Sequence, residues 1–119
     1  MYQIKVKTNF SAAHNLENYH GKCEHLHGHN WNIEAVFCYE LLGKDGMAVD
    51  FKIAKKLVMG VAEKLDHAYL NKLPILNKIN PTSENIAKFI YDKVKIKNKH
   101  IYSIAVWEND NSCATYSED

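Results

Sequence analysis

The sequence predicts an α+β fold in which a four-stranded antiparallel sheet carries two helices on one face. Two observations lead to this prediction: polar and apolar residues alternate near both ends of the chain, and apolar residues recur with a helical period in its middle. The resulting order of elements is β-β-α-α-β-β, without an internal repeat or a linker. We therefore expect residues 1–119 to form a single domain, which their number also favours.

Four segments have the composition of strands. Residues 2–10 alternate between apolar and polar side chains, as expected for a strand with one buried face. Residues 29–40 are rich in aromatic and β-branched residues, and residues 100–108 and 112–118 form a closing pair. Because a four-stranded sheet has two open edges, these edges need another chain or charged side chains as protection.

Two amphipathic helices are predicted between the strand pairs. The first begins after Asp50, whose carboxylate is a suitable N-cap. Its apolar residues recur every four positions at Ile53, Leu57, Val61 and Leu65. The second begins in the segment PTSEN, where Thr82 or Ser83 can cap the helix. The carboxylate of Glu84, in the first turn, interacts favourably with the positive end of the helix dipole. Its apolar stripe consists of Ile86, Phe89, Ile90 and Val94.

The composition argues against several classes of protein. The formal net charge is +1, so no overall field favours nucleic acid or a membrane surface as a partner. All fifteen basic residues are Lys, and an anionic ligand must be bound without a guanidinium group. The three Cys residues are odd in number and widely spaced, which is typical of a reducing compartment. The first ten residues alternate rather than form an apolar run, so we expect a cytoplasmic protein without a signal peptide.

The segment CEHLHGH, from Cys23 to His29, concentrates groups that bind metals or transfer protons. His27 and His29 are two residues apart, so on a strand both side chains lie on one face and can bind the same ion. Neutral imidazoles favour Zn(II), Cu, Ni or Fe(II). A third ligand can come from His14, if the first two strands form a hairpin, or from His25. The local spacing does not choose between them.

Other interpretations of this segment are weaker. A surface loop with several histidines needs no metal, and the stretch from Gly21 to Glu34 matches the first half of a cupin metal motif. The cupin match fails at Leu41, where its closing Gly would stand, and cupins are all-β proteins. Cys23 strengthens the catalytic interpretation, since a thiolate near a metal is a competent base. Cys38 and Cys113, inside predicted strands, are interpreted as buried structural thiols.

Three further segments carry acid–base or hydrogen-bonding groups. Asp66 can orient the adjacent His67 for proton transfer, although a histidine near a helix C-terminus also interacts favourably with the helix dipole. Glu108, at the end of a predicted strand, is either a solvated carboxylate or an acceptor for paired N–H donors of a heterocycle. The start of the second helix, with Thr82 and Ser83, can present N–H groups and hydroxyls to such a ligand.

Taken in order along the chain, these segments resemble the family of 6-pyruvoyl-tetrahydropterin synthase and 6-carboxy-tetrahydropterin synthase. The resemblance covers nearly the whole chain, and the length is similar to that of the short bacterial 6-carboxy-tetrahydropterin synthases. The segments that carry the resemblance are FSAAH, CEHLHGH, MAVDF, LDHAYLN, PTSEN and the strand-end Glu108.

This resemblance implies a fold, an assembly and a set of site residues. The fold is the tunnelling fold, in which the sheets of three subunits join into a barrel and two such trimers form a hexamer. The implied site residues are the zinc ligands His14, His27 and His29, the catalytic residues Cys23, Asp66 and His67, and the pterin-binding residues Glu108, Thr82 and Ser83. In these roles Cys23 is the base, Asp66 and His67 relay protons, and Glu108 binds the amino-pyrimidine edge of the pterin.

The implied reaction converts 7,8-dihydroneopterin triphosphate into 6-carboxy-5,6,7,8-tetrahydropterin for 7-deazaguanine (queuosine) synthesis, with acetaldehyde and triphosphate as the other products. Zinc would stabilise charge on the side-chain oxygens while Cys23 removes a carbon-bound proton. Three alternatives stay open: a 6-pyruvoyl-tetrahydropterin synthase, an enzyme of folate synthesis that cleaves dihydroneopterin to 6-hydroxymethyl-dihydropterin, and a non-enzymatic metal- or purine-binding protein on the same fold.

Glu24 raises the possibility of two activities in one protein. It stands three residues before His27, which resembles the branch of the family where a glutamate replaces the cysteine and the product is 6-hydroxymethyl-dihydropterin. An isolated glutamate in a loop can equally be a solvated residue. Because a thiolate and a carboxylate differ in basicity and reach, the hypothesis is that Cys23 supports the carboxy product and Glu24 the hydroxymethyl product.

Overall fold

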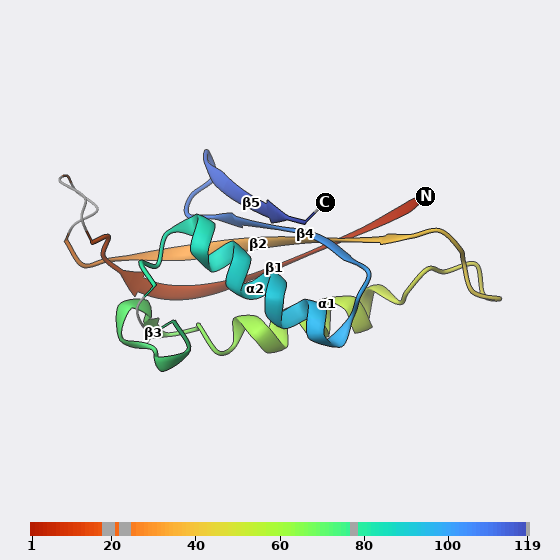
Figure 1. Cartoon of the computed structure of the whole chain (residues 1–119), viewed down its shortest axis with the longest axis horizontal. Coiled ribbons are helices and arrows are strands. Elements are labelled where there is room, and N and C mark those ends of the chain that lie inside the picture. The colour runs from red at the N-terminus through yellow and green to blue at the C-terminus, as the bar shows by residue number, and fades with distance from the viewer. Residues whose placement is uncertain (18–20, 22–24, 77–78, 119) are drawn as a thin grey trace.

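In the computed structural model, a long sheet carries two helices on one of its faces (Figure 1). The structure describes residues 1–17, 21, 25–76 and 79–118. Its strands are β1 (Tyr2–His14), β2 (His27–Tyr39), β3 (Ala68–Tyr69), β4 (Ile101–Trp107) and β5 (Cys113–Ser117). Its helices are α1 (Phe51–Ala62) and α2 (Ser83–Lys97), with the short 3-10 helices η2 (Leu70–Lys72) and η3 (Pro74–Leu76) between them.

The sheet has five strands in the order β3-β1-β2-β4-β5 and is mixed, so the prediction of four antiparallel strands is wrong in this detail. The four predicted strands do form an antiparallel run, and β1 pairs with β2 along its whole length, which places His14 opposite His27. The additional strand, β3, runs parallel to β1. It lies there because the N–H of Ser11 donates to the carboxylate of Asp66, and the carbonyl of Ser11 accepts from the N–H of His67.

The hydrophobic core lies between the sheet and the two helices. The large, fully buried hydrophobic side chains in it include Phe10, Trp31, Ile33, Phe37, Leu65, Leu70, Leu76, Ile86, Ile90 and Ile104. The four residues of the stripe predicted for α2 are all buried, so this prediction is confirmed. On the polar face of the β1–β2 pair, Lys5 and Lys7 lie 3.8 and 3.7 Å from Glu34. The alternation along β1 and β2 therefore separates a helix-covered face from a polar one.

Helix α1 begins where the sequence predicts, and its buried face matches the predicted stripe in part. Asp50 is its N-cap, and the carboxylate accepts a hydrogen bond from the N–H of Lys52 at 2.8 Å. Of the predicted stripe, Val61 and Leu65 are buried and Leu57 packs against the core, whereas Ile53 is 64% exposed. Ala54 and Val58 are buried as well, so the buried face includes the end of the predicted stripe and, in the first turns, the neighbouring series.

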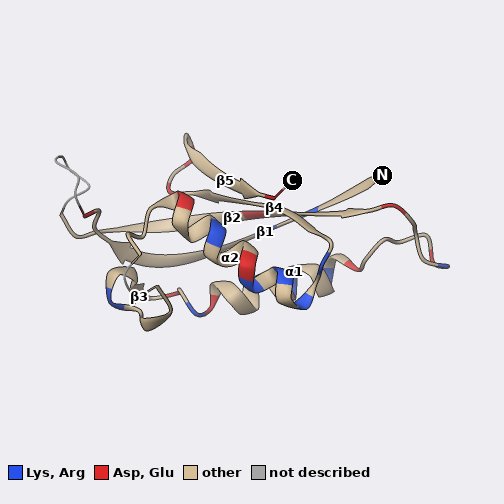
Figure 2. Cartoon of the chain, in the orientation of Figure 1, with Lys and Arg blue, Asp and Glu red and all other residues tan. Residues whose placement is uncertain are grey.

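Charged residues of both signs are interspersed along α2 (Figure 2). Lys88 pairs with Asp92 one turn further along the helix, at 2.8 Å, and Lys95 lies 2.6 Å from Glu118, which ties the end of the chain to the helix. The exposed face of α2 is therefore of mixed charge. Within the described ranges, no helix combines the length and the apolar character needed to cross a membrane.

Candidate metal centre and active site

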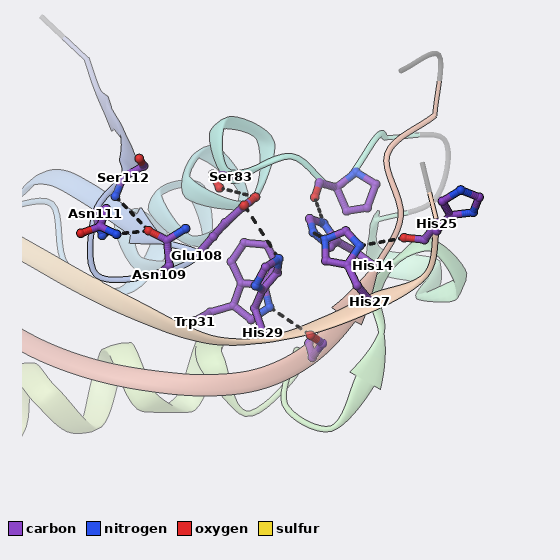
Figure 3. A network of polar contacts seen from close by, with 12 residues as sticks. His14, His25, His27, His29, Trp31, Ser83, Glu108, Asn109, Asn111 and Ser112 are labelled. Atoms are coloured by element: carbon purple, nitrogen blue, oxygen red, sulfur yellow. Dashed lines mark hydrogen bonds and ion pairs between the residues drawn. The ribbon is translucent and has the colours of Figure 1, made fainter. Parts of the chain in front are cut away.

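Three histidines converge where β1 ends and β2 begins (Figure 3). The antiparallel register places His14 opposite His27, and the alternation of side chains along β2 puts His29 on the same face as His27. One nitrogen from each ring lies within 4.8 Å of the other two. Among the described residues these three form the group that can hold a metal ion, and His25 is not part of it. The geometry therefore favours His14 over His25 as the third ligand.

Main-chain hydrogen bonds set the proton positions on two of the three rings. His14 Nδ1 lies 2.7 Å from the carbonyl oxygen of Pro81, and His27 Nδ1 lies 2.7 Å from the carbonyl oxygen of His25. Because a carbonyl oxygen accepts and cannot donate, both Nδ1 atoms carry the proton of the neutral ring, and each Nε2 keeps its lone pair. The two Nε2 atoms lie 3.0 Å apart, where their lone pairs repel unless a cation lies between them. This arrangement fits a metal ion.

Burial favours the neutral, metal-binding form of two of these rings. Desolvation lowers the pKa of His14, which is fully buried, and this effect outweighs the opposing hydrogen bond to Pro81. Desolvation also lowers the pKa of His29, against the opposing charge of Glu108. Within the described part of the chain, His29 Nε2 is buried and has no hydrogen-bond partner. Two imidazole nitrogens that keep their lone pairs, beside a third ring whose neutral form is favoured by burial, are a donor set typical of Zn(II) and similar metals.

Trp31 packs against the rings of His14 and His29, and the sequence did not predict it as part of the site. Its indole is fully buried and donates from Nε1 to the carbonyl oxygen of Ala12 at 3.1 Å. The rings of His14 and His29 stand edge-on to the indole, with centroids 4.8 and 5.2 Å away. The sequence does contain a signal for this contact, because Trp31 stands two residues after His29 and therefore lies on the same face of the strand.

Glu108 connects helix α2 with the histidines. Its Oε1 accepts a hydrogen bond from Ser83 Oγ at 3.0 Å, and its Oε2 lies 3.8 Å from His29 Nε2. The carboxylate is therefore oriented by its neighbours, while 26% of the side chain remains exposed. An oriented and partly accessible carboxylate can accept hydrogen bonds from two N–H donors of a ligand.

The two hydroxyls at the start of α2 have different partners. Thr82 Oγ1 accepts a hydrogen bond from the N–H of Asn85 at 3.1 Å and so caps the helix. Ser83, the first residue of α2, directs its hydroxyl to Glu108. A depression of about 260 Å³ opens beside this pair, and it is lined by Ser83, Glu84, Glu108, Ser112, Cys113 and Ala114. Ser83 thus orients the partly accessible carboxylate of Glu108, whereas Thr82 stabilises the start of the helix.

Asp66 and His67 form a pair at the edge of β1. Asp66 Oδ2 lies 3.0 Å from His67 Nδ1, and Asp66 Oδ1 accepts a hydrogen bond from the N–H of Ser11 at 2.8 Å. Helix α1 ends at Ala62, so His67 lies beyond it, and its φ of 55° lets two adjacent side chains meet. The Ser11 N–H, aided by His67, lowers the pKa of Asp66. The His67 ring is 82% exposed and can exchange protons with a ligand.

The remaining site predictions concern cysteines and a glutamate. Cys23 and Glu24 lie outside the described residues. Of the two cysteines interpreted as buried thiols, Cys38 is half-buried and Cys113 is exposed. The interpretation is wrong for Cys113 because burial alternates along β5 and Cys113 falls on the exposed face of the strand.

The fold and the site define a small α+β protein in which three histidines that can hold a metal ion lie beside an oriented carboxylate. The family model described as 6-pyruvoyl tetrahydropterin synthase matches residues 3–119, and the chain belongs to this family. Several relatives are named 6-carboxy-5,6,7,8-tetrahydropterin synthase, and two of them match this chain over nearly its whole length. That of Haemophilus influenzae is 30% identical over 141 residues (99% of this chain, 100% of the relative), and that of Synechocystis is 35% identical over 122 residues (98% and 93%).

Two further similarities extend this comparison. A dihydroneopterin monophosphate aldolase of Pyrococcus furiosus is 36% identical over 112 residues, which are 91% of this chain and 90% of the relative. Among solved structures, the 6-pyruvoyl tetrahydropterin synthase of Caenorhabditis elegans superposes with a TM-score of 0.89 at 28% identity, over 99% of this chain and 96% of that one. The similarity thus extends over nearly the full length of both proteins in each comparison.

Proposed function

We propose that this protein is a zinc-dependent lyase that converts 7,8-dihydroneopterin triphosphate into 6-carboxy-5,6,7,8-tetrahydropterin. The observation that carries the proposal is the histidine triad, in which two Nδ1 atoms are bound to carbonyl oxygens and the Nε2 lone pairs converge. The choice of substrate and product is supported by the names of the relatives from Haemophilus influenzae and Synechocystis. The product serves 7-deazaguanine (queuosine) synthesis in this proposal.

The metal ligands and the pterin-binding carboxylate divide the binding of the substrate. His14, His27 and His29 would hold the zinc ion, which when bound supplies Lewis acidity to oxygens of the substrate side chain. Glu108 accepts hydrogen bonds from the amino group and the ring N–H of the pterin. Ser83 keeps the Glu108 carboxylate in the orientation for this contact.

Proton transfer is the task of the cysteine and of the Asp–His pair. Cys23 removes a carbon-bound proton as a thiolate. Asp66 binds Nδ1 of His67, so Nε2 of His67 is the atom that exchanges a proton with the substrate. Because the N–H of Ser11 helps to keep Asp66 ionised, the carboxylate stabilises the imidazolium that forms when His67 takes up a proton.

An oligomeric barrel completes the proposal. In the described chain, β3 covers the outer edge of β1 at Ala12 and Ala13, and the edge before them offers backbone N–H and C=O groups to another chain. A barrel of three subunits, stacked in pairs as a hexamer, would pair this edge. The proposed unit is a single cytoplasmic domain of residues 1–119, with a pterin as its small-molecule partner.

A second activity is favoured by one specific observation. The relative from Pyrococcus furiosus, at 36% identity, is named a dihydroneopterin monophosphate aldolase. In the sequence, Glu24 directly follows Cys23 and stands three positions before His27. We propose that Glu24 supports cleavage of dihydroneopterin to 6-hydroxymethyl-dihydropterin, in addition to the reaction that depends on Cys23.

One experiment tests both activities. Zinc-loaded protein is incubated with dihydroneopterin triphosphate and, separately, with dihydroneopterin, and the products are identified by mass. The main proposal predicts 6-carboxy-tetrahydropterin from the triphosphate, and its absence would refute that proposal. Cys23→Ala should lose the carboxy product and Glu24→Ala the hydroxymethyl product. If Cys23→Ala abolishes every product, or Glu24→Ala changes none, the second activity is refuted.

A further inference from the structure

The chain leaves strand β1 through a short segment, residues 15–17, that is held by two asparagine side chains. Asn71, in η2, accepts a hydrogen bond from the N–H of Asn15 at 3.0 Å and donates from Nδ2 to the carbonyl oxygen of Asn15 at 2.8 Å. These bonds continue the pairing between β1 and β3, because a side-chain amide offers the same donor and acceptor as a peptide group. Tyr69 adds a bond from its hydroxyl to Asn15 Oδ1 at 2.6 Å.

The second asparagine makes the same kind of contact two residues further along. Asn80 Oδ1 accepts a hydrogen bond from the N–H of Glu17 at 3.0 Å, and Asn80 Nδ2 donates to the carbonyl oxygen of Glu17 at 3.2 Å. Asn80 is itself fixed, since its carbonyl oxygen accepts from Asn85 Nδ2 and from the N–H of Thr82, both at 2.8 Å. The side chains of Asn71 and Asn80, both more than 50 residues after β1 in the sequence, are thus hydrogen-bonded to the segment that follows β1.

Both contacts lie next to groups that orient the metal ligand His14. Asn15 follows His14 directly in the chain. Pro81, whose carbonyl oxygen accepts the Nδ1–H of His14 at 2.7 Å, directly follows Asn80. Such a carbonyl sets the orientation and the tautomer of a metal-binding histidine. Since His14 is fully buried, water cannot readily replace this partner if the carbonyl moves.

We propose that Asn71 and Asn80 are positioning residues for the metal centre. They hold the end of β1 and the Pro81 carbonyl in the arrangement that directs His14 Nε2 to the metal. This inference rests on the proposed metal-dependent function and adds to it two residues whose side chains bind the main chain of Asn15 and Glu17. Each position requires an amide, because the side chain uses its donor and its acceptor at the same time.

The test uses the near-isosteric variants Asn71→Asp and Asn80→Asp, in which a carboxylate oxygen replaces the donor and faces a carbonyl oxygen. The matched control is Asn98→Asp, because the Asn98 amide also uses its donor and its acceptor. It donates to the Tyr39 hydroxyl at 3.2 Å and accepts from the N–H of His100 at 2.9 Å. That amide lies at the other end of the β1–β2 pair. Zn²⁺ and Co²⁺ are titrated into each full-length protein, and the Co²⁺ absorption spectrum reports the geometry of the ligands.

We expect Asn80→Asp to weaken metal binding about tenfold and to change the Co²⁺ spectrum, with a change in the same direction for Asn71→Asp. Asn98→Asp should keep the wild-type metal affinity and Co²⁺ spectrum, even if its melting temperature falls as much as those of the two site variants. Wild-type behaviour of both site variants, or an equal loss in the control, would overturn the inference. If the wild type binds no metal, the proposed function fails as well. If it binds metal and turns over substrate while the variants bind equally, the inference alone fails.

Discussion

The hydrogen bond between Ser83 and Glu108 allows a quantitative prediction for pterin binding. Ser83→Ala removes a hydroxyl that donates to Glu108 Oε1 at 3.0 Å. A hydrogen bond to a charged group contributes about 1.5–3 kcal/mol. Because 26% of the Glu108 side chain is exposed, water can partly replace the hydroxyl, and we expect a loss near the lower limit. A loss of about 1.5 kcal/mol corresponds to roughly tenfold weaker binding of the pterin.

The assay measures pterin binding and zinc content separately. Zinc-loaded protein is titrated with neopterin, binding is followed by the fluorescence of the pterin, and the bound metal is quantified in each variant. Ser112→Ala is the matched control, because Ser112 lines the same depression. We expect Ser83→Ala to keep its zinc and the control to bind neopterin as the wild type does. Unchanged neopterin affinity in Ser83→Ala would refute the orienting role, and loss of its zinc would refute the separation of the two subsites.

Three further outcomes are expected. Glu108→Ala should weaken pterin binding by about 2–4 kcal/mol with zinc still bound, because the charged acceptor itself is lost, and an unchanged affinity would contradict this role. His14→Ala should lose zinc in metal analysis while His25→Ala keeps it, and the reverse result would make His25 the ligand. An NMR titration should find the pKa of Asp66 below its ordinary 3.8, owing to the Ser11 N–H, and an unshifted pKa would argue against this bond. The stabilisation from the bond is then complete above the unfolded pKa and lost as the pH falls through the lowered one.

The parts of the fold that the sequence predicted are those with a long, regular pattern. Strands β1 and β2 alternate over many residues, and α2 carries an apolar stripe that matches its buried face. Strand β3 has two residues and hence no pattern to detect. It exists because Asp66 and His67 bind the main chain of Ser11, which is a tertiary contact. For α1, Ile53 and Ala54 begin neighbouring four-residue series, and the buried face takes Val61 from the first and Ala54 and Val58 from the second.

The site shows the same division between residue type and main-chain geometry. The spacing of His27 and His29 was enough to predict a shared face, because side-chain alternation is a local property of a strand. The choice of His14 needed the register of the hairpin, which local spacing does not contain. The carbonyl groups that orient the rings could not be predicted from the sequence, since every residue has a carbonyl group and no residue type distinguishes that of Pro81.

The segment before α2 links the histidine group to the carboxylate of Glu108. Pro81 offers its carbonyl oxygen to His14, and two residues later Ser83 offers its hydroxyl to Glu108, whose other oxygen lies 3.8 Å from His29 Nε2. Between these two contacts stands the helix cap, which sets the direction in which α2 begins. Because both contacts come from the same turn of chain, we expect a displacement of that turn to move His14 and the Glu108 carboxylate together. In the proposed site, the start of one helix would therefore set the distance between the metal and the pterin, while β1 and β2 supply the three histidines.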